Sequence, residues 1–256
     1  MKKLLLMLSV CMVFFSSCIQ NPTENPDPTI VPPAGLLLKK AVDTYQGATG
    51  DSIVTSNFTY LGNKLVSVID DVATESDMYV TYTGNLISKI EYQYIDGSVD
   101  QRNTYIYDDT NRLVTFIRVD PEMDLGNKET YVYNSDGTIS VTSFIGDATT
   151  QTQASASVGT ITFTAGEIST ITDSDLTVTY TYDNKNNPQK NILGMDKIAF
   201  ADHYTSGIMH NVLTETENRL GIIDSYIYQY TYNTQDYPAT IIQDEGEGTF
   251  TTAYFY

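Results

Sequence analysis

Residues 104–117 read Thr104-Tyr105-Ile106-Tyr107-Asp108-Asp109-Thr110-Asn111-Arg112-Leu113-Val114-Thr115-Phe116-Ile117. Tyr105 and Tyr107 alternate with Ile106, so the two tyrosines share one face of a strand and the isoleucine lies on the other. Residues 108–111 are of the types that tight turns require, and a second run rich in β-branched and apolar residues follows them. This pattern predicts a β-hairpin.

The hairpin pattern recurs along the chain. Each copy has an aromatic residue, a short polar turn and an outgoing strand of the form apolar-x-Ser/Thr-x-apolar. The aromatic residues that precede the turns are Tyr60, Tyr82, Tyr107, Tyr133, Phe163, Tyr182 and Tyr232. They follow one another at roughly 20–30 residues, with one gap of about 50, and such a period is typical of stacked supersecondary units. The sequence therefore predicts an all-β fold, an antiparallel hairpin-repeat sheet of about seven or eight hairpins that is curled or barrel-like to hide its edges.

The outgoing strands also predict a packing rule. Strict alternation along residues 65–69, 86–90 and 113–117 places the first, third and fifth residue of each strand on one face. The small residues near the middle of these strands are Ser67, Ser88 and Thr115. We expect a tyrosine ring of the hairpin partner to cover each small side chain, because a large group over a small one fills volume.

The first residues predict an export signal. Lys2 and Lys3 precede a short apolar run, and small residues then lead to Cys18. The run is too short to span a membrane, so we interpret residues 1–17 as a lipoprotein signal peptide and Cys18 as the lipidated residue. The alternative is an ordinary secretory signal with an incidental cysteine.

The rest of the chain divides into a tether and a single domain. Residues 18–35 hold five of the eight prolines, which predicts an extended, semi-rigid segment between the lipid anchor and the domain. Residues 36–256 are then one β-hairpin-repeat domain, long enough to bury a core. Cys11 and Cys18 are the two cysteines, so the mature domain is predicted to be held together without disulfides.

The formal net charge of −18 restricts the partners. It disfavours nucleic acid and an anionic membrane surface, and it favours solubility and cations. Contact with the membrane is therefore expected through the lipid on Cys18 alone, on the outer membrane at either the cell surface or the periplasmic face. Acidic residues are also common in the solvated turns of secreted β-proteins. On this alternative interpretation, the net charge implies no partner.

The hairpin sequence resembles a known repeat. Residues 105–113 are similar to the YD (RHS-type) repeat, in which Tyr-x-Tyr-Asp precedes a glycine-containing turn and Arg-Leu; Asn111 stands at the glycine position. Residues 179–188 look similar through the turn. The chain over residues 36–256 also resembles a group of uncharacterised Gram-negative lipoproteins with degenerate YD-like hairpins. The resemblance implies a YD-repeat-like antiparallel meander and no catalytic residues.

Catalytic motifs are not recognised in the sequence, and we predict that the protein is not an enzyme. A hydrolase stays as the less favoured alternative, because some pair among 32 acidic residues can meet across a cleft. His203 and His210 are the two histidines, with Asp196 and Asp202 nearby. Their spacing of seven residues favours ordinary loop histidines over a metal site.

Calcium is the one cofactor for which the sequence offers candidate ligands. Acidic clusters lie at residues 108–109, 134–137, 173–175 and 244–247. Calcium prefers six to eight oxygen ligands, and none of the clusters has the spacing of the twelve-residue calcium loop. Because Asp, Asn and Gly are also the residues of tight turns, turn formation explains the same clusters. We therefore predict no cofactor, with calcium as the alternative.

Tyrosine is the most distinctive binding residue, with 20 tyrosines and no tryptophan. An exposed row at Tyr226, Tyr228, Tyr230 and Tyr232 would stack on sugar rings; alternatively these rings belong to the core. We predict an envelope lipoprotein that binds a polysaccharide or another surface polymer through this Tyr-rich sheet. The alternative is a structural or assembly protein that binds an envelope protein through a sheet edge or through a pattern-breaking insertion at residues 187–223.

A membrane-spanning barrel is not predicted. The aromatic residues 254–256 at the end of the chain are typical of outer-membrane barrels, but such barrels need an apolar outward band. Here the strand faces opposite the tyrosines hold many Thr, Gln, Lys and Arg residues.

Overall fold

The computed structural model describes residues 35–47, 50–72, 76–244 and 248–256. The predicted signal peptide, the lipidation site Cys18 and the tether up to residue 34 lie outside the described residues. The strands and helices are β1 (Lys40–Gly47), β2 (Gly50–Leu61), β3 (Lys64–Asp70), β4 (Asp77–Thr83), β5 (Leu86–Gln93), β6 (Val99–Tyr107), β7 (Leu113–Asp120), β8 (Leu125–Tyr133), β9 (Ile139–Gly146), β10 (Gln151–Thr164), β11 (Glu167–Thr172), β12 (Leu176–Tyr182), α1 (Met195–Ile198), η1 (Ala201–His203), β13 (Val212–Arg219), β14 (Ile222–Tyr232), β15 (Pro238–Asp244) and β16 (Gly248–Phe255).

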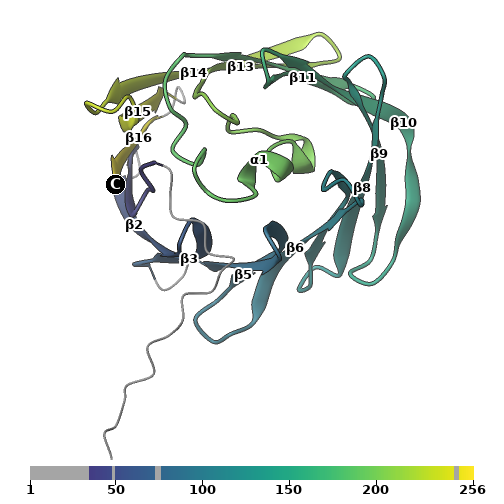
Figure 1. The fold of residues 1–256 in the computed structure, drawn as a ribbon, viewed down its shortest axis with the longest axis horizontal. Coiled ribbons are helices and arrows are strands. Elements are labelled where there is room, and N and C mark those ends of the chain that lie inside the picture. Colours follow the sequence, from purple (N-terminus) through teal and green to yellow (C-terminus); the bar gives the residue numbers. More distant parts are fainter. Residues whose placement is uncertain (1–34, 48–49, 73–75, 245–247) are drawn as a thin grey trace, which may run out of the picture.

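The strands form one closed barrel (Figure 1). Each strand pairs antiparallel with its neighbours in sequence, and β1 closes the ring against β16, with Lys40 opposite Phe255. The prediction of an antiparallel, barrel-like hairpin meander is confirmed. The prediction that a partner binds through a sheet edge is wrong, because closure pairs the backbone groups that an edge would offer.

The aromatic residues of the repeat mark one end of the barrel, which we call the tyrosine rim. The turns between β2 and β3, β4 and β5, β6 and β7, and β8 and β9 all lie there. Each of these turns needs a left-handed backbone, and the residues that adopt it are Gly62, Gly84, Asn111 and Gly137. Glycine and asparagine accept a positive φ at low cost, which explains their recurrence at this point of the repeat.

A β-bulge follows the aromatic residue in most of the hairpins. Tyr82 pairs with Ile87 while Thr81 pairs with Lys89, which leaves Ser88 as the extra residue. The same shift occurs at Tyr60, Tyr107, Phe163 and Tyr232. A bulge inserts one residue and reverses the alternation beyond it.

The bulge overturns the predicted packing rule. Leu113 and Phe116, the first and fourth residues of β7, are both buried in the core, and Thr115 between them pairs with the outward-facing Ile106. The small residues Ser67 and Thr115 therefore do not lie under the luminal tyrosines of their hairpins. Ser88 donates a hydrogen bond to the carbonyl oxygen of Thr81 instead.

Residues 183–211 leave the wall after β12, enter the ring and return to β13 (Figure 1). We call them the luminal segment. A barrel of about 16 strands is too wide for wall side chains alone to fill, so this segment completes the core. Phe200 packs edge-on against Tyr131, with ring centroids 5.1 Å apart. The predicted insertion at residues 187–223 thus contains the short helix α1, and strand β13 lies near its end.

Neither helix of the described chain has the length and the apolar character required to cross a membrane.

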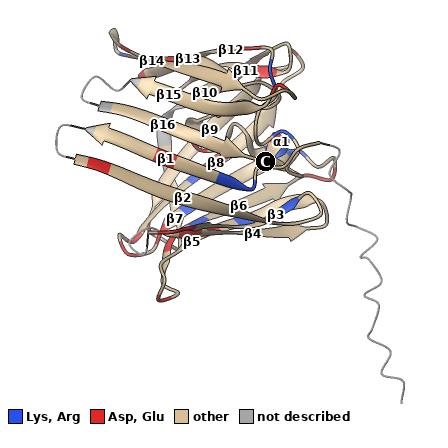
Figure 2. Cartoon of the chain, turned by 90° about the vertical axis from the view of Figure 1, so that its left-hand side faces the viewer, with Lys and Arg blue, Asp and Glu red and all other residues tan. Residues whose placement is uncertain are grey.

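The outward face of the wall mixes polar and apolar side chains. Thr181 pairs with Thr214, and Thr231 pairs with Thr240, in both cases with their hydroxyls in contact. In the middle of β5 and β6, Glu91 forms outward ion pairs with Lys89 and Arg102. Figure 2 shows further acidic residues at the turns that join the strands. Charges and threonines thus alternate with exposed aliphatic residues on this face.

Candidate functional site: a cavity in the lumen

The tyrosines of β14 point into the barrel. Tyr226, Tyr228, Tyr230 and Tyr232 are half-buried, whereas Ile227 between them is 60% exposed on the outside. Two hydroxyls of the row bond to the wall: Tyr230 donates to the carbonyl oxygen of Val212 (2.9 Å), and Tyr228 donates to Glu215 (3.3 Å). The predicted row therefore exists, but on the luminal face of the wall.

Tyr228 and Tyr230 line a luminal cavity of about 270 Å³. Tyr254, Tyr204 and two carboxyl groups also line it, those of Asp43 and Glu215. These residues come from β1, β13, β14, β16 and the luminal segment. Tyr232 is directed elsewhere, since its hydroxyl bonds to Asp183 at the tyrosine rim. The structure thus brings two of the four predicted tyrosines into one site.

Burial shifts the pKa of the two cavity acids. It raises the pKa of Asp43, and the carboxylate of Asp70 adds to the effect, while a hydrogen bond from Thr252 opposes it. Burial likewise raises the pKa of Glu215, with a further contribution from Glu217. Among the described residues, no Lys, Arg or His forms an ion pair with Asp43 or Glu215. These carboxyls are therefore available to a ligand as hydrogen-bond acceptors and, when protonated, as donors.

Tyr204, like Asp43 and Glu215, is a residue of this site that the sequence did not single out. It follows η1 inside the ring, yet 53% of its surface is exposed, because it borders open luminal space. The partial burial of its side chain raises the pKa of its hydroxyl, and Glu215 adds to the shift. An aromatic ring held inside a barrel but accessible on its face is suited to stacking on a ligand.

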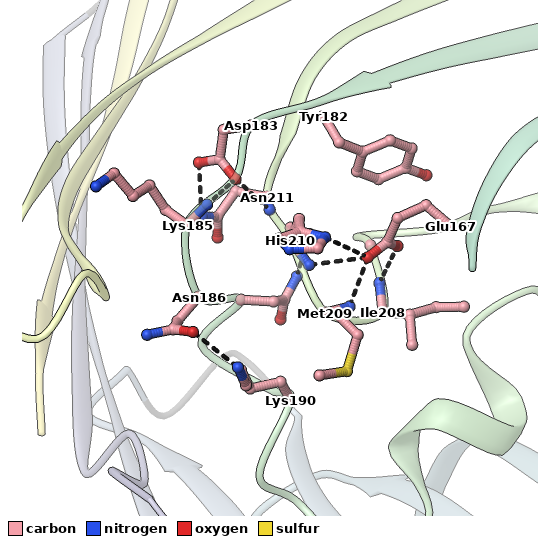
Figure 3. Close-up of polar contacts among 12 residues, drawn as sticks. Glu167, Tyr182, Asp183, Lys185, Asn186, Lys190, Ile208, Met209, His210 and Asn211 are labelled. Atoms are coloured by element: carbon pink, nitrogen blue, oxygen red, sulfur yellow. Dashed lines mark hydrogen bonds and ion pairs between the residues drawn. The ribbon is translucent and has the colours of Figure 1, made fainter. Parts of the chain in front are cut away.

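A buried carboxylate, Glu167, fixes the returning arm of the luminal segment (Figure 3). Glu167 is 4% exposed and accepts three backbone N–H bonds, from Ile208 (2.8 Å), Met209 (2.8 Å) and His210 (3.0 Å). The Nδ1 atom of His210 lies 3.1 Å from the same carboxylate. Several donors on one carboxylate satisfy loop N–H groups that would otherwise be buried without partners.

Next to this contact, Asp183 closes the base of the luminal segment (Figure 3). It accepts hydrogen bonds from the backbone and the side chain of Asn211, at 3.0 and 2.9 Å, and from the backbone of Lys185 at 2.9 Å. The two ends of the segment are thereby joined at the tyrosine rim.

A second carboxylate, Glu129, holds the η1 turn. It accepts hydrogen bonds from the hydroxyl of Tyr131 and the backbone of Asp202, and it contacts Nδ1 of His203. The contact with Glu129 raises the pKa of His203. Asp202 and His203 both have positive φ, 64° and 57°, so this turn is strained and depends on its contacts with the wall.

Metal binding finds no support at the two histidines. His203 and His210 contact different carboxylates, Glu129 and Glu167, on different strands. Over the parts of the chain that the structure describes, no group of three or more His, Cys, Asp or Glu side chains is arranged to hold a metal ion.

Two of the four predicted calcium clusters, residues 108–109 and 134–137, form turns, and residues 245–247 of the last cluster lie outside the described residues. Asp108 accepts the backbone N–H of Thr110 at 2.9 Å, and Asp136 accepts that of Thr138 at 3.0 Å. The backbone N–H of Arg112, which also bonds to Asp108 at 3.0 Å, contributes most to lowering the pKa of Asp108, and the bonds from Thr138 lower the pKa of Asp136. A side chain that bonds to the backbone two residues on is the signature of an Asx turn, so the turn interpretation accounts for both.

Comparisons with known proteins find similarity among solved structures. No protein-family profile matches the sequence, and no curated protein sequence is similar to it. Among solved structures, a porin-like protein from Bacteroides uniformis ATCC 8492 has a TM-score of 0.47 and 14% sequence identity, over 85% of this chain and 97% of that chain. A similarity at this level describes the path of the backbone and says nothing about ligands.

Proposed function

We propose that this protein is a non-enzymatic envelope lipoprotein whose barrel stands in water and binds a saccharide in its luminal cavity. One observation carries the proposal: a single cavity combines the rings of Tyr204, Tyr228 and Tyr230 with the carboxyls of Asp43 and Glu215. Aromatic faces stack on sugar rings, and carboxyl groups bond to hydroxyls that both donate and accept.

The cavity limits how much of a polymer can bind. At about 270 Å³ it is slightly smaller than typical sites for small molecules, which begin near 300 Å³. It therefore suits one sugar residue, or the end of a polysaccharide, and not an extended chain along the wall. The predicted ligand, a polysaccharide or another polymer, is therefore restricted to a single sugar residue or a chain end.

The outward face supports a barrel in water, anchored through Cys18. A charged side chain in the lipid-facing band of a membrane barrel is destabilising, by about 2–4 kcal/mol for Lys or Arg at the midplane. Lys89 and Arg102 lie on that face, next to Glu91 in the middle of the strands. The lipid on Cys18 would then supply the attachment to the outer membrane.

The test is a saccharide panel titrated into the mature chain carrying Cys18→Ala, followed by calorimetry. We expect one sugar to bind, Glu215→Gln to weaken binding at least tenfold, and the exposed-turn control Glu122→Gln to leave it unchanged. The sugar should be recovered unaltered after incubation. Failure of every sugar to bind a folded sample, or cleavage of the sugar, would overturn the proposal.

A second candidate, binding of an envelope protein, is favoured by the tip of the β13–β14 hairpin. Leu220, Ile222 and Ile223 are 80%, 70% and 63% exposed at the rim opposite the tyrosine rim. Neighbouring exposed aliphatic residues are typical of contact surfaces. Photo-crosslinking from position 222 in intact cells should then give one discrete product, and crosslinking from the outward Thr216 should not.

A further inference from the structure

A second cavity of about 230 Å³ lies between the luminal segment and the wall. Its lining is mostly apolar: Met78 and Ile90 from β4 and β5, and Met195 and Ile198 from α1. Asp196 at its border is the one charged side chain among the lining residues. Because the space is enclosed mainly by aliphatic and thioether groups, it favours an apolar occupant over water.

The two cavities adjoin. Phe58 on β2 and residues Gln189, Tyr204, Thr205 and Ser206 of the luminal segment line both of them. Tyr204 is the largest exposed group at this boundary. The acidic, tyrosine-lined cavity, which we call the acidic chamber, therefore lies next to the apolar cavity, which we call the apolar chamber. The luminal segment supplies most of the residues between them.

Size indicates that the two chambers belong together. Sites for small molecules usually have volumes of about 300–1,000 Å³, and each chamber alone falls below this range. The two together reach it. An apolar cavity of about 150 Å³ holds benzene, so by proportion the apolar chamber has room for about nine non-hydrogen atoms.

We infer that the ligand is amphiphilic, with its sugar in the acidic chamber and an aliphatic chain of about eight carbons in the apolar chamber. This inference rests on the proposed function for the sugar and adds a separate site for the chain. Tyr204, Gln189 and Phe58 would contact the junction between sugar and chain. Burial of an alkyl chain contributes affinity in proportion to its length, which a neutral sugar alone does not provide.

The experiment compares glucose, hexyl glucoside and octyl glucoside, all below their micelle concentrations, by calorimetry on the mature chain with Cys18→Ala. Each buried methylene should tighten binding about fourfold, so octyl glucoside should bind roughly tenfold or more tightly than hexyl glucoside. Ala199→Leu adds bulk to the wall of the apolar chamber. It should abolish the dependence on chain length and leave glucose binding unchanged.

The outcomes separate the two proposals. If glucose and both glucosides bind equally well, the apolar site is wrong and the sugar site stands. If octanol or octylamine binds as tightly as octyl glucoside, the sugar site is wrong. Met78→Ala enlarges the apolar chamber, so it should preserve or increase the dependence of affinity on chain length. If Ala199→Leu fails to fold, this second variant tests whether the alkyl chain binds in the apolar chamber.

Discussion

The hydroxyl of Tyr107 donates a hydrogen bond of 2.7 Å to the carbonyl oxygen of Ile87 in the preceding hairpin. Tyr133 makes the equivalent bond to Leu113, and Tyr182 makes it to Ile168. In each case the acceptor lies at or next to the start of an outgoing strand, beside the bulge or the turn. The recurring aromatic residue therefore joins successive hairpins to one another, which explains why it stands immediately before the turn.

The first prediction concerns this bond. Tyr107→Phe should destabilise the barrel by about 1–2 kcal/mol, because the carbonyl of the fully buried Ile87 loses its hydroxyl donor. For a domain of this size that is a fall in melting temperature of about 2–8 °C. Thermal unfolding followed by circular dichroism measures it. The control is Tyr79→Phe on the outward face, where the ring is 38% exposed and little change is expected.

The second prediction tests the bulge at Ser88. Deleting Ser88 would place Lys89 directly after Ile87, opposite the consecutive partners Thr81 and Tyr82. Simple alternation would return with Ile87 and Ile90 toward the core and Lys89 and Glu91 outward, so the protein should still fold. Ser88→Ala keeps the bulge and removes one exposed hydrogen bond to Thr81, so it should cost less than about 1 kcal/mol. Loss of folding in the deletion variant, measured by urea denaturation, would show that the register depends on the extra residue.

Hairpin order and turn positions could be predicted because both depend on local chemistry. An aromatic residue followed by a tight polar turn, such as Tyr107 before the turn that contains Asn111, predicts a hairpin at each place where this pattern recurs. The bulge was missed, because the sequence Leu113-Val114-Thr115-Phe116 reads equally well as an uninterrupted alternating strand. It becomes visible only in the cross-strand register, where Tyr107 pairs with Leu113.

The candidate site was less predictable, because closure of the barrel assembles it. Asp43 on β1 and Glu215 on β13 are distant in sequence and meet only when β16 pairs with β1. Neither stands in a motif. Tyr228 and Tyr230 were found from their alternation, but alternation cannot show whether a face turns inward or outward until the ring closes.

The third prediction concerns the attachment of the luminal segment by Glu167. Glu167→Gln replaces one acceptor oxygen with an NH₂ group that faces backbone N–H donors. We expect a loss of about 1–3 kcal/mol and faster proteolysis within residues 183–211, while the wall persists. Glu122→Gln in an exposed turn is the matched control. A protease pattern identical to that of the unmodified protein would contradict this role.

The fourth prediction follows from His203. Glu129 raises its pKa above the ordinary value, and the carboxylates of Asp173 and Asp202 add to this effect. A raised pKa in the folded state contributes stability below the unfolded value of about 6.5, and this contribution is lost as the pH rises through the raised value. The difference in melting temperature between the unmodified protein and His203→Gln should therefore be larger near pH 6 than near pH 9. If this difference in melting temperature grows with increasing pH instead, the folded protein stabilises the neutral form of His203.

The last prediction asks what surrounds the wall. Val132 is 61% exposed on the outward face of β8, whereas its neighbour Tyr131 is 4% exposed and faces the core. In water, Val132→Lys should change the free energy of unfolding by no more than about 0.5 kcal/mol. In the lipid-facing band of a membrane barrel, the same change would cost about 2–4 kcal/mol.

The mature chain with Cys18→Ala should also stay monodisperse without detergent in size-exclusion chromatography. A requirement for detergent, together with a large cost for Val132→Lys, would place this wall in lipid, and the luminal cavity would then have to be interpreted as part of a membrane-embedded barrel.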